Sequence, residues 1–141
     1  MAEAPPKPAT VVELIWEHDL VFAGTSGDAR MTLDSHGVAG PSPVQALAFS
    51  LAGCMAMDVV HILGKGRHDL RGLRVDLTAE RAPLDPRRVT AVTLRFTING
   101  KVPRELVDRA VELSREKYCS VWHSLRQDIT LSVTSTISAG A

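Results

Sequence analysis

The stretch from Gly40 to Gly66, GPSPVQALAFSLAGCMAMDVVHILGKG, is the most apolar part of the 141-residue chain. Its start is typical of a helix N-terminus. Ser42 can act as the cap, Pro43 suits the first helical position, and Gln45 stands three residues after Ser42, as a capping box requires. We therefore expect a helix that begins at Pro43 and runs for about 21 residues, until Gly64 provides a stop signal.

Apolar residues surround almost the whole circumference of this predicted helix, which implies burial on all sides. A domain of this length can wrap few helices completely, so we expect a second copy of the chain to cover part of it. The apolar run from Ala46 to Met57 is about 12 residues, short of the roughly 20 that a membrane span needs. Asp58 and His61 follow it directly. The sequence predicts a core helix and no membrane partner.

The composition is that of an ordinary globular protein, with 45% hydrophobic and 23% charged residues. Sixteen basic residues balance sixteen acidic ones, so the chain has no electrostatic footprint for nucleic acid. The start, MAEAPPKPATVVEL, lacks the charged, apolar and small-residue succession of a secretory signal. We predict a cytoplasmic location and no nucleic-acid partner.

The rest of the chain alternates strand and helix patterns. Residues 1–10 contain three prolines and predict a flexible tail, and residues 11–141 predict a single domain. Strand patterns precede the apolar helix as two or three short antiparallel strands, and follow it around residues 73–78 and 92–98 as an antiparallel pair. An amphipathic helix is predicted from Pro103 to Tyr118, then a short turn or helix, and a last strand from Ile129. This order indicates an α+β fold with helices against largely antiparallel sheet.

Two cysteines are the first candidates for chemistry. Cys54 precedes Asp58 by four residues and His61 by seven, so all three lie along one helix face, where an acid or imidazole could tune the thiol. Cys119 lies where the amphipathic helix ends, close to Trp122 in sequence. The alternative for both cysteines is simple core packing.

The spacing of the cysteines excludes the usual zinc motifs, because neither lies in a CxxC pair. The five histidines also lack ligand spacing, so no metal site is expected. A permanent disulfide is not expected in a reducing cytosol. Two buried thiols, one reactive thiol, and a reversible redox pair remain open.

Three segments together resemble one known family: GPSPVQALAFSLAGCMAMDVVHIL, KGRHDLRGLRVDLTAER and LSREKYCSVWHSL. They are similar to the OsmC/Ohr family of osmotically induced and organic hydroperoxide resistance proteins, most closely to its YhfA-like branch. The resemblance runs from about Trp16 to the C-terminus. It is specific because both cysteines fall in the family's two places, one inside the apolar helix and one after a Lys-Tyr pair.

The resemblance implies an OsmC-like fold, in which antiparallel sheets from two chains wrap long central apolar helices in an intertwined homodimer. It also implies oxidative-stress protection by thiol-dependent reduction of organic hydroperoxides. Cys54 would be the peroxidatic cysteine, and Cys119 the resolving cysteine that forms a disulfide with it. A lipoyl or thioredoxin-like dithiol would restore both thiols. The resemblance implies no metal and no bound cofactor.

The chain also departs from the family's hydroperoxidases. They carry a glutamate ten residues before the peroxidatic cysteine, where this chain has Val44, followed by Gln45. They also carry an arginine in the N-terminal strands that favours the thiolate, and WEHDLVFAG has none. Gln45, Asp58, His61 and Arg81 are the candidate supporting residues. The alternative function is a non-catalytic dimer of the same fold that binds a small apolar ligand, acyl or lipid-like, near Cys54.

Overall fold

The computed structural model describes residues 4–138, and the chain divides into two compact units, residues 1–47 and 48–141, which are described separately. Residues 4–12 are exposed and form no helix or strand. Residues 1–3 of the predicted tail lie outside the described residues. The flexibility of the tail and the single domain over residues 11–141 stay predictions.

The first unit contains three short antiparallel strands, β1 (Glu13–His18), β2 (Val21–Ser26) and β3 (Ala29–Asp34). The predicted two or three strands are therefore three, in the order β1-β2-β3. A two-residue turn joins β2 to β3, and Gly27 adopts a φ of 58°, which glycine tolerates without steric cost. At the end of β3 the buried Asp34 carboxylate accepts backbone N–H groups from the following loop, which lowers the pKa of this carboxyl.

Helix α1 (Pro43–Lys65) confirms the predicted start of the apolar helix. The capping box forms in both directions: the Ser42 N–H donates to Gln45 Oε1 at 2.9 Å, and the Gln45 N–H donates to Ser42 Oγ at 3.2 Å. The helix spans 23 residues, so by length and composition it could cross a membrane, although its apolar run alone is shorter. We interpret it as a core helix, because one of its faces packs into the core of the second unit.

Burial on all sides of α1 does not occur within a single chain. The buried residues of α1 recur every four positions and so form one stripe: Leu51, Met55, Val59 and Leu63. Phe49 and Met57, on another face, keep 69% and 73% of their surface exposed. Coverage of this second face by another copy of the chain stays a prediction.

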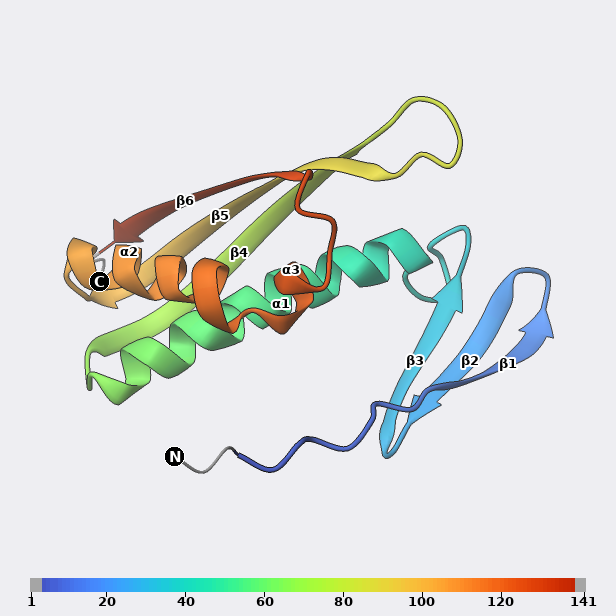
Figure 1. The fold of residues 1–141 in the computed structure, drawn as a ribbon, viewed down its shortest axis with the longest axis horizontal. Coiled ribbons are helices and arrows are strands. Elements are labelled where there is room, and N and C mark those ends of the chain that lie inside the picture. The colour runs from blue at the N-terminus through green and yellow to red at the C-terminus, as the bar shows by residue number, and fades with distance from the viewer. Residues whose placement is uncertain (1–3, 139–141) are drawn as a thin grey trace. The chain divides into compact units, whose positions relative to one another are not determined.

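The second unit is built on a sheet of β4 (Asp69–Arg81), β5 (Val89–Lys101) and β6 (Thr130–Ser138), in that order (Figure 1). The predicted antiparallel pair is β4 with β5, and β6 joins β5 in parallel. Every second residue of the central strand faces the core: Val92, Leu94, Phe96 and Ile98. These side chains form one hydrophobic cluster with the buried stripe of α1.

The region after β5 differs from the expected continuous helix. Helix α2 (Arg104–Leu113) ends five residues early, and a π-helical turn, η1 (Ser114–Tyr118), follows before the short helix α3 (Ser120–His123). The Cys119 N–H donates to the Ser114 carbonyl at 2.8 Å, five residues back, which is the hydrogen bond of a π-helix. This wider turn places Cys119 at the junction of η1 and α3.

Candidate functional site

Three side chains that can carry chemistry meet inside the second unit. The sulfur atoms of Cys54 and Cys119 and a carboxylate oxygen of Asp58 all lie within 4.8 Å of one another. Cys54 and Asp58 are one helical turn apart on α1, so they project from the same face. Cys119 reaches them from the η1–α3 junction. The fold thus brings together two cysteines that are 65 residues apart in the sequence.

Cys119 is a fully buried thiol. Its sulfur accepts the backbone N–H of Trp122 at 3.4 Å. Burial raises the pKa of the Cys119 thiol from about 9.0 to about 11, opposed by the Trp122 N–H and reinforced by the neighbouring Cys54 thiol and the Asp58 charge. Cys119 therefore keeps its proton at neutral pH.

Cys54 differs from Cys119 in its access to solvent. It is half-buried and free, on the side of α1 that borders the core. Part of the Cys54 residue is therefore exposed to solvent, whereas the protein covers Cys119 completely. The two thiols have the unequal exposure that a division of roles would require.

Asp58 is held in place by a buried serine. Ser114 Oγ donates to Asp58 Oδ2 at 2.8 Å, and Ser114 has no exposed surface. This hydrogen bond fixes the carboxylate at the thiols and leaves its other oxygen free to accept a proton or a ligand. The sequence prediction missed Ser114. Its signal is a polar residue that continues the buried stripe of Val107 and Ala110.

The other predicted supporting residues lie outside this cluster. His61 is exposed, one turn after Asp58 on α1. The Gln45 side chain caps α1. Arg81 lies at the end of β4, where its Nε donates to the Arg87 carbonyl at 2.8 Å and braces the β4–β5 connection.

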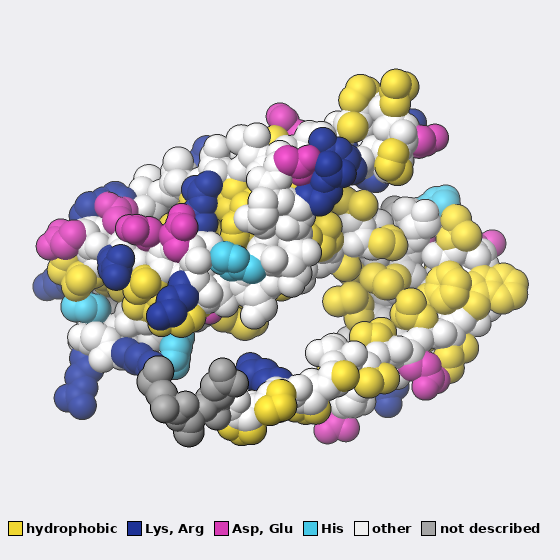
Figure 2. Space-filling view, in the orientation of Figure 1, with side chains coloured by type: hydrophobic (Ala, Val, Ile, Leu, Met, Phe, Trp, Pro, Cys, Tyr) yellow, Lys and Arg dark blue, Asp and Glu magenta, His cyan; other side chains and the backbone are white. Residues whose placement is uncertain are grey.

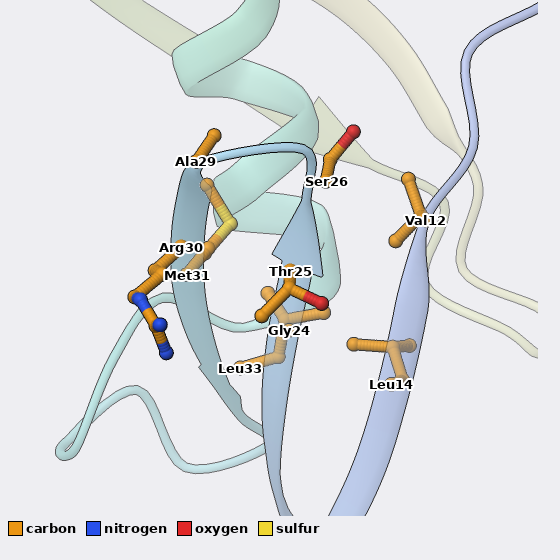
Figure 3. Close-up of a pocket in the computed structure, with 9 residues that line it drawn as sticks. All are labelled: Val12, Leu14, Gly24, Thr25, Ser26, Ala29, Arg30, Met31 and Leu33. Carbon is orange, nitrogen blue, oxygen red and sulfur yellow. The ribbon is translucent and has the colours of Figure 1, made fainter.

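The first unit has an apolar groove of about 250 Å³ on its sheet (Figure 3). Gly24 forms its floor: a Cβ atom there would lie 3.0 Å from Leu14 Cδ2 and 2.8 Å from the Met31 carbonyl oxygen, so a larger residue would displace its neighbours. Cys54 does not line this groove. The lining residues are Val12, Leu14, Gly24, Thr25, Ser26, Ala29, Arg30, Met31 and Leu33.

Helix α1 packs against the sheet of β4, β5 and β6, and the sulfur atoms of Cys54 and Cys119 lie within 4.8 Å of each other. The family model described as "OsmC-like protein" matches residues 34–134. The chain therefore belongs to the OsmC family. The predicted family and the predicted α+β, OsmC-like fold are confirmed.

Relatives and solved structures agree with this assignment. Protein YhfA of Escherichia coli K12 is 39% identical over 119 residues, which cover 82% of this chain and 89% of YhfA. A hypothetical protein from Aquifex aeolicus VF5 has a TM-score of 0.86 at 26% identity, covering 94% of this chain and 98% of that one. An organic hydroperoxide resistance protein OsmC from Legionella pneumophila has a TM-score of 0.69 at 12% identity, covering 94% and 99%. The last likeness shows the fold alone.

Proposed function

We propose that this protein protects the cytoplasm against oxidative stress by reducing organic hydroperoxides with the Cys54–Cys119 thiol pair. The observation that carries the proposal is the approach of the two sulfur atoms within 4.8 Å, with one thiol half-buried and the other fully buried. Membership of the OsmC family supports it, since solved neighbours of this fold are named organic hydroperoxide resistance proteins.

The first step takes place at Cys54. Its thiolate attacks the terminal oxygen of the hydroperoxide, the O–O bond breaks, and the departing alkoxide takes up the proton that the thiol released and becomes an alcohol. Cys54 becomes a sulfenic acid. Because Cys54 is the more exposed thiol, it meets the substrate first.

The second step joins the two sulfurs. The Cys119 thiol loses its proton and attacks the Cys54 sulfur, the S–O bond breaks, and water leaves as the disulfide forms. A disulfide bond is about 2.05 Å long, so the side chains must rotate to close the gap of up to 4.8 Å. A lipoyl or thioredoxin-like dithiol then returns two electrons and two protons and restores both thiols.

Asp58 is the proton acceptor for Cys119 in this proposal. Cys119 reacts as a thiolate, yet burial keeps it protonated at neutral pH. The Asp58 carboxylate belongs to the same cluster, and the Ser114 hydroxyl holds it there. In this proposal Asp58 is the supporting carboxylate of the site. The glutamate of the family's hydroperoxidases is absent here, because its position is occupied by Val44.

The test mixes reduced protein with cumene hydroperoxide and follows peroxide and free thiols together. The wild type should lose two thiols for each peroxide consumed within minutes. Cys119→Ser should lose one thiol and accumulate a sulfenic acid that reacts with dimedone, whereas Cys54→Ser should consume no peroxide. Equal, slow thiol loss in all three proteins would rule the proposal out.

We also propose that two copies of the chain associate through α1. Phe49, Met57 and Val60 lie on one face of this helix and are all exposed in the single chain, and exposed large apolar residues that share one face mark an interface. Sedimentation of the wild type should give a dimer. Met57→Lys should sediment as a monomer, and the control Thr78→Lys, at an exposed position of β4, should stay dimeric. A monomeric wild type would refute the proposal.

A non-catalytic role in binding a small acyl or lipid-like ligand is the second candidate, favoured by the apolar groove on the first sheet. Hydrophobic side chains also gather over the β1–β3 unit in the space-filling view (Figure 2). Native mass spectrometry of the purified protein distinguishes the two functions. A co-purified apolar ligand together with thiols that resist peroxide would favour the binding role.

A further inference from the structure

We propose that the reduced protein binds one thiophilic divalent cation, Zn²⁺, through Cys54 Sγ, Cys119 Sγ and an Asp58 carboxylate oxygen. Nothing in the peroxide reaction requires this ion. The proposal rests on the juxtaposition of three deprotonatable ligand atoms, all within 4.8 Å of one another, on α1 and at the η1–α3 junction.

The spacing of the three ligand atoms is compatible with a zinc site. With Zn–S bonds of about 2.3 Å and Zn–O bonds of about 2.0 Å, tetrahedral ligand atoms lie roughly 3.5–3.8 Å apart. The observed atoms lie no more than 4.8 Å apart. Side-chain rotations that bring the ligand atoms about 1 Å closer to one another would therefore enclose the ion. Three protein ligands leave the fourth position to water.

The surroundings of the cluster also suit a cation. The Ser114 hydroxyl occupies one oxygen of Asp58 and so orients the other, which is how proteins commonly fix a carboxylate ligand. Cys54 and Asp58 are only half-buried, so solvent reaches part of each residue, while Cys119 forms the buried end of the site. Thiolate ligands select Zn²⁺ over harder ions such as Mg²⁺ and Ca²⁺.

Binding must be coupled to the protonation and redox state of the thiols. Zinc binds thiolates, so binding releases a proton from each protonated thiol to solvent. Both sulfurs are also consumed when a disulfide forms. Zinc and the Cys54–Cys119 disulfide therefore exclude each other, and the bound ion would shield both thiols from oxidation.

Ligand pairs close together in the chain are the usual sequence signal of a zinc site, and this cluster lacks them. Here only Cys54 and Asp58 are close in sequence, and a cysteine with an aspartate four residues later matches no common zinc motif. The third ligand, Cys119, follows the π-helical turn η1 and precedes α3.

The test is anaerobic titration of the reduced, metal-free protein with Co²⁺, used as a spectroscopic substitute for Zn²⁺. We expect one Co²⁺ per chain, with the intense near-ultraviolet absorption of cobalt–thiolate bonds, and complete displacement of Co²⁺ by Zn²⁺. Cys54→Ala should lower the thiolate absorption per bound Co²⁺. Ser114→Ala should weaken Zn²⁺ binding about 10- to 100-fold, because it frees the ligating carboxylate.

Two controls make the result decisive. Asp58→Asn should weaken binding strongly, whereas Asp76→Asn, the same change at an exposed carboxylate of β4 paired with Arg74, should not. Circular dichroism confirms that each variant is folded. Absence of thiolate absorption in a wild type with two titratable thiols would overturn the proposal, as would equal binding by the Cys54→Ala variant. No peroxide enters this experiment, so its outcome is independent of the peroxidase test.

Discussion

The buried Cys119 thiol predicts a specific loss of stability at alkaline pH. Its pKa is about 11 in the folded protein, against about 9.0 in an exposed thiol, chiefly because burial disfavours the thiolate. Below pH 9 the thiol is protonated in both the folded and the unfolded state, so its contribution to stability is fully present. As the pH rises from 9 through 11 the unfolded state ionises first, and this contribution is lost. The difference of two pKa units corresponds to roughly 3 kcal/mol.

The assay is urea denaturation under reducing conditions from pH 7 to pH 11.5, on the wild type and on Cys119→Ala. The alanine variant starts less stable because it leaves a cavity, but that cost does not depend on pH. The difference in unfolding free energy between the two proteins should therefore shrink by roughly 2 kcal/mol between pH 8 and pH 11, where the folded-state thiol is only half ionised. Parallel stability profiles across this range would refute the account of Cys119 as a desolvated thiol.

Two further perturbations test other parts of the structure. Ser42→Ala removes one half of the capping box of α1 and should lower the unfolding free energy by about 1 kcal/mol, measured by urea denaturation at pH 7; an unchanged value would show that the cap contributes nothing. Asp58→Asn removes the proposed proton acceptor, so after cumene hydroperoxide the sulfenic acid at Cys54 should persist and the disulfide should form at least 10-fold more slowly at pH 7, a defect that should narrow at high pH. Unchanged disulfide formation, followed by stopped-flow thiol titration, would remove Asp58 from the mechanism.

Much of the fold follows from local sequence signals. The capping box at Ser42 and Gln45 fixes where α1 begins, and period-two alternation in β5 identifies the core face of the sheet. The end of α2 could not be predicted from the sequence, because LSREKY is as compatible with a regular helix as with the π-helical turn that forms. That choice depends on tertiary packing around Cys119.

Part of the candidate site also follows from local sequence, and part depends on contacts between distant segments. The one-turn spacing on α1 predicts that Cys54 and Asp58 share a face, and their proximity follows from helix geometry alone. The approach of Cys119 and the hydrogen bond from Ser114 join segments 56 or more residues apart, and no local pattern encodes such contacts. His61 is the opposite case, since its spacing predicted a supporting role but the residue is exposed and does not belong to the cluster of Cys54, Asp58 and Cys119.

The proposed function requires Cys54 and Cys119 to act as one redox pair. Its most direct measurement is mass spectrometry of the protein after one equivalent of cumene hydroperoxide, followed by alkylation and digestion. We expect the intact chain to lose the mass of two hydrogen atoms and the peptides containing Cys54 and Cys119 to be joined by a disulfide, which a dithiol reverses. Two alkylated, unlinked cysteines after complete peroxide exposure would contradict it.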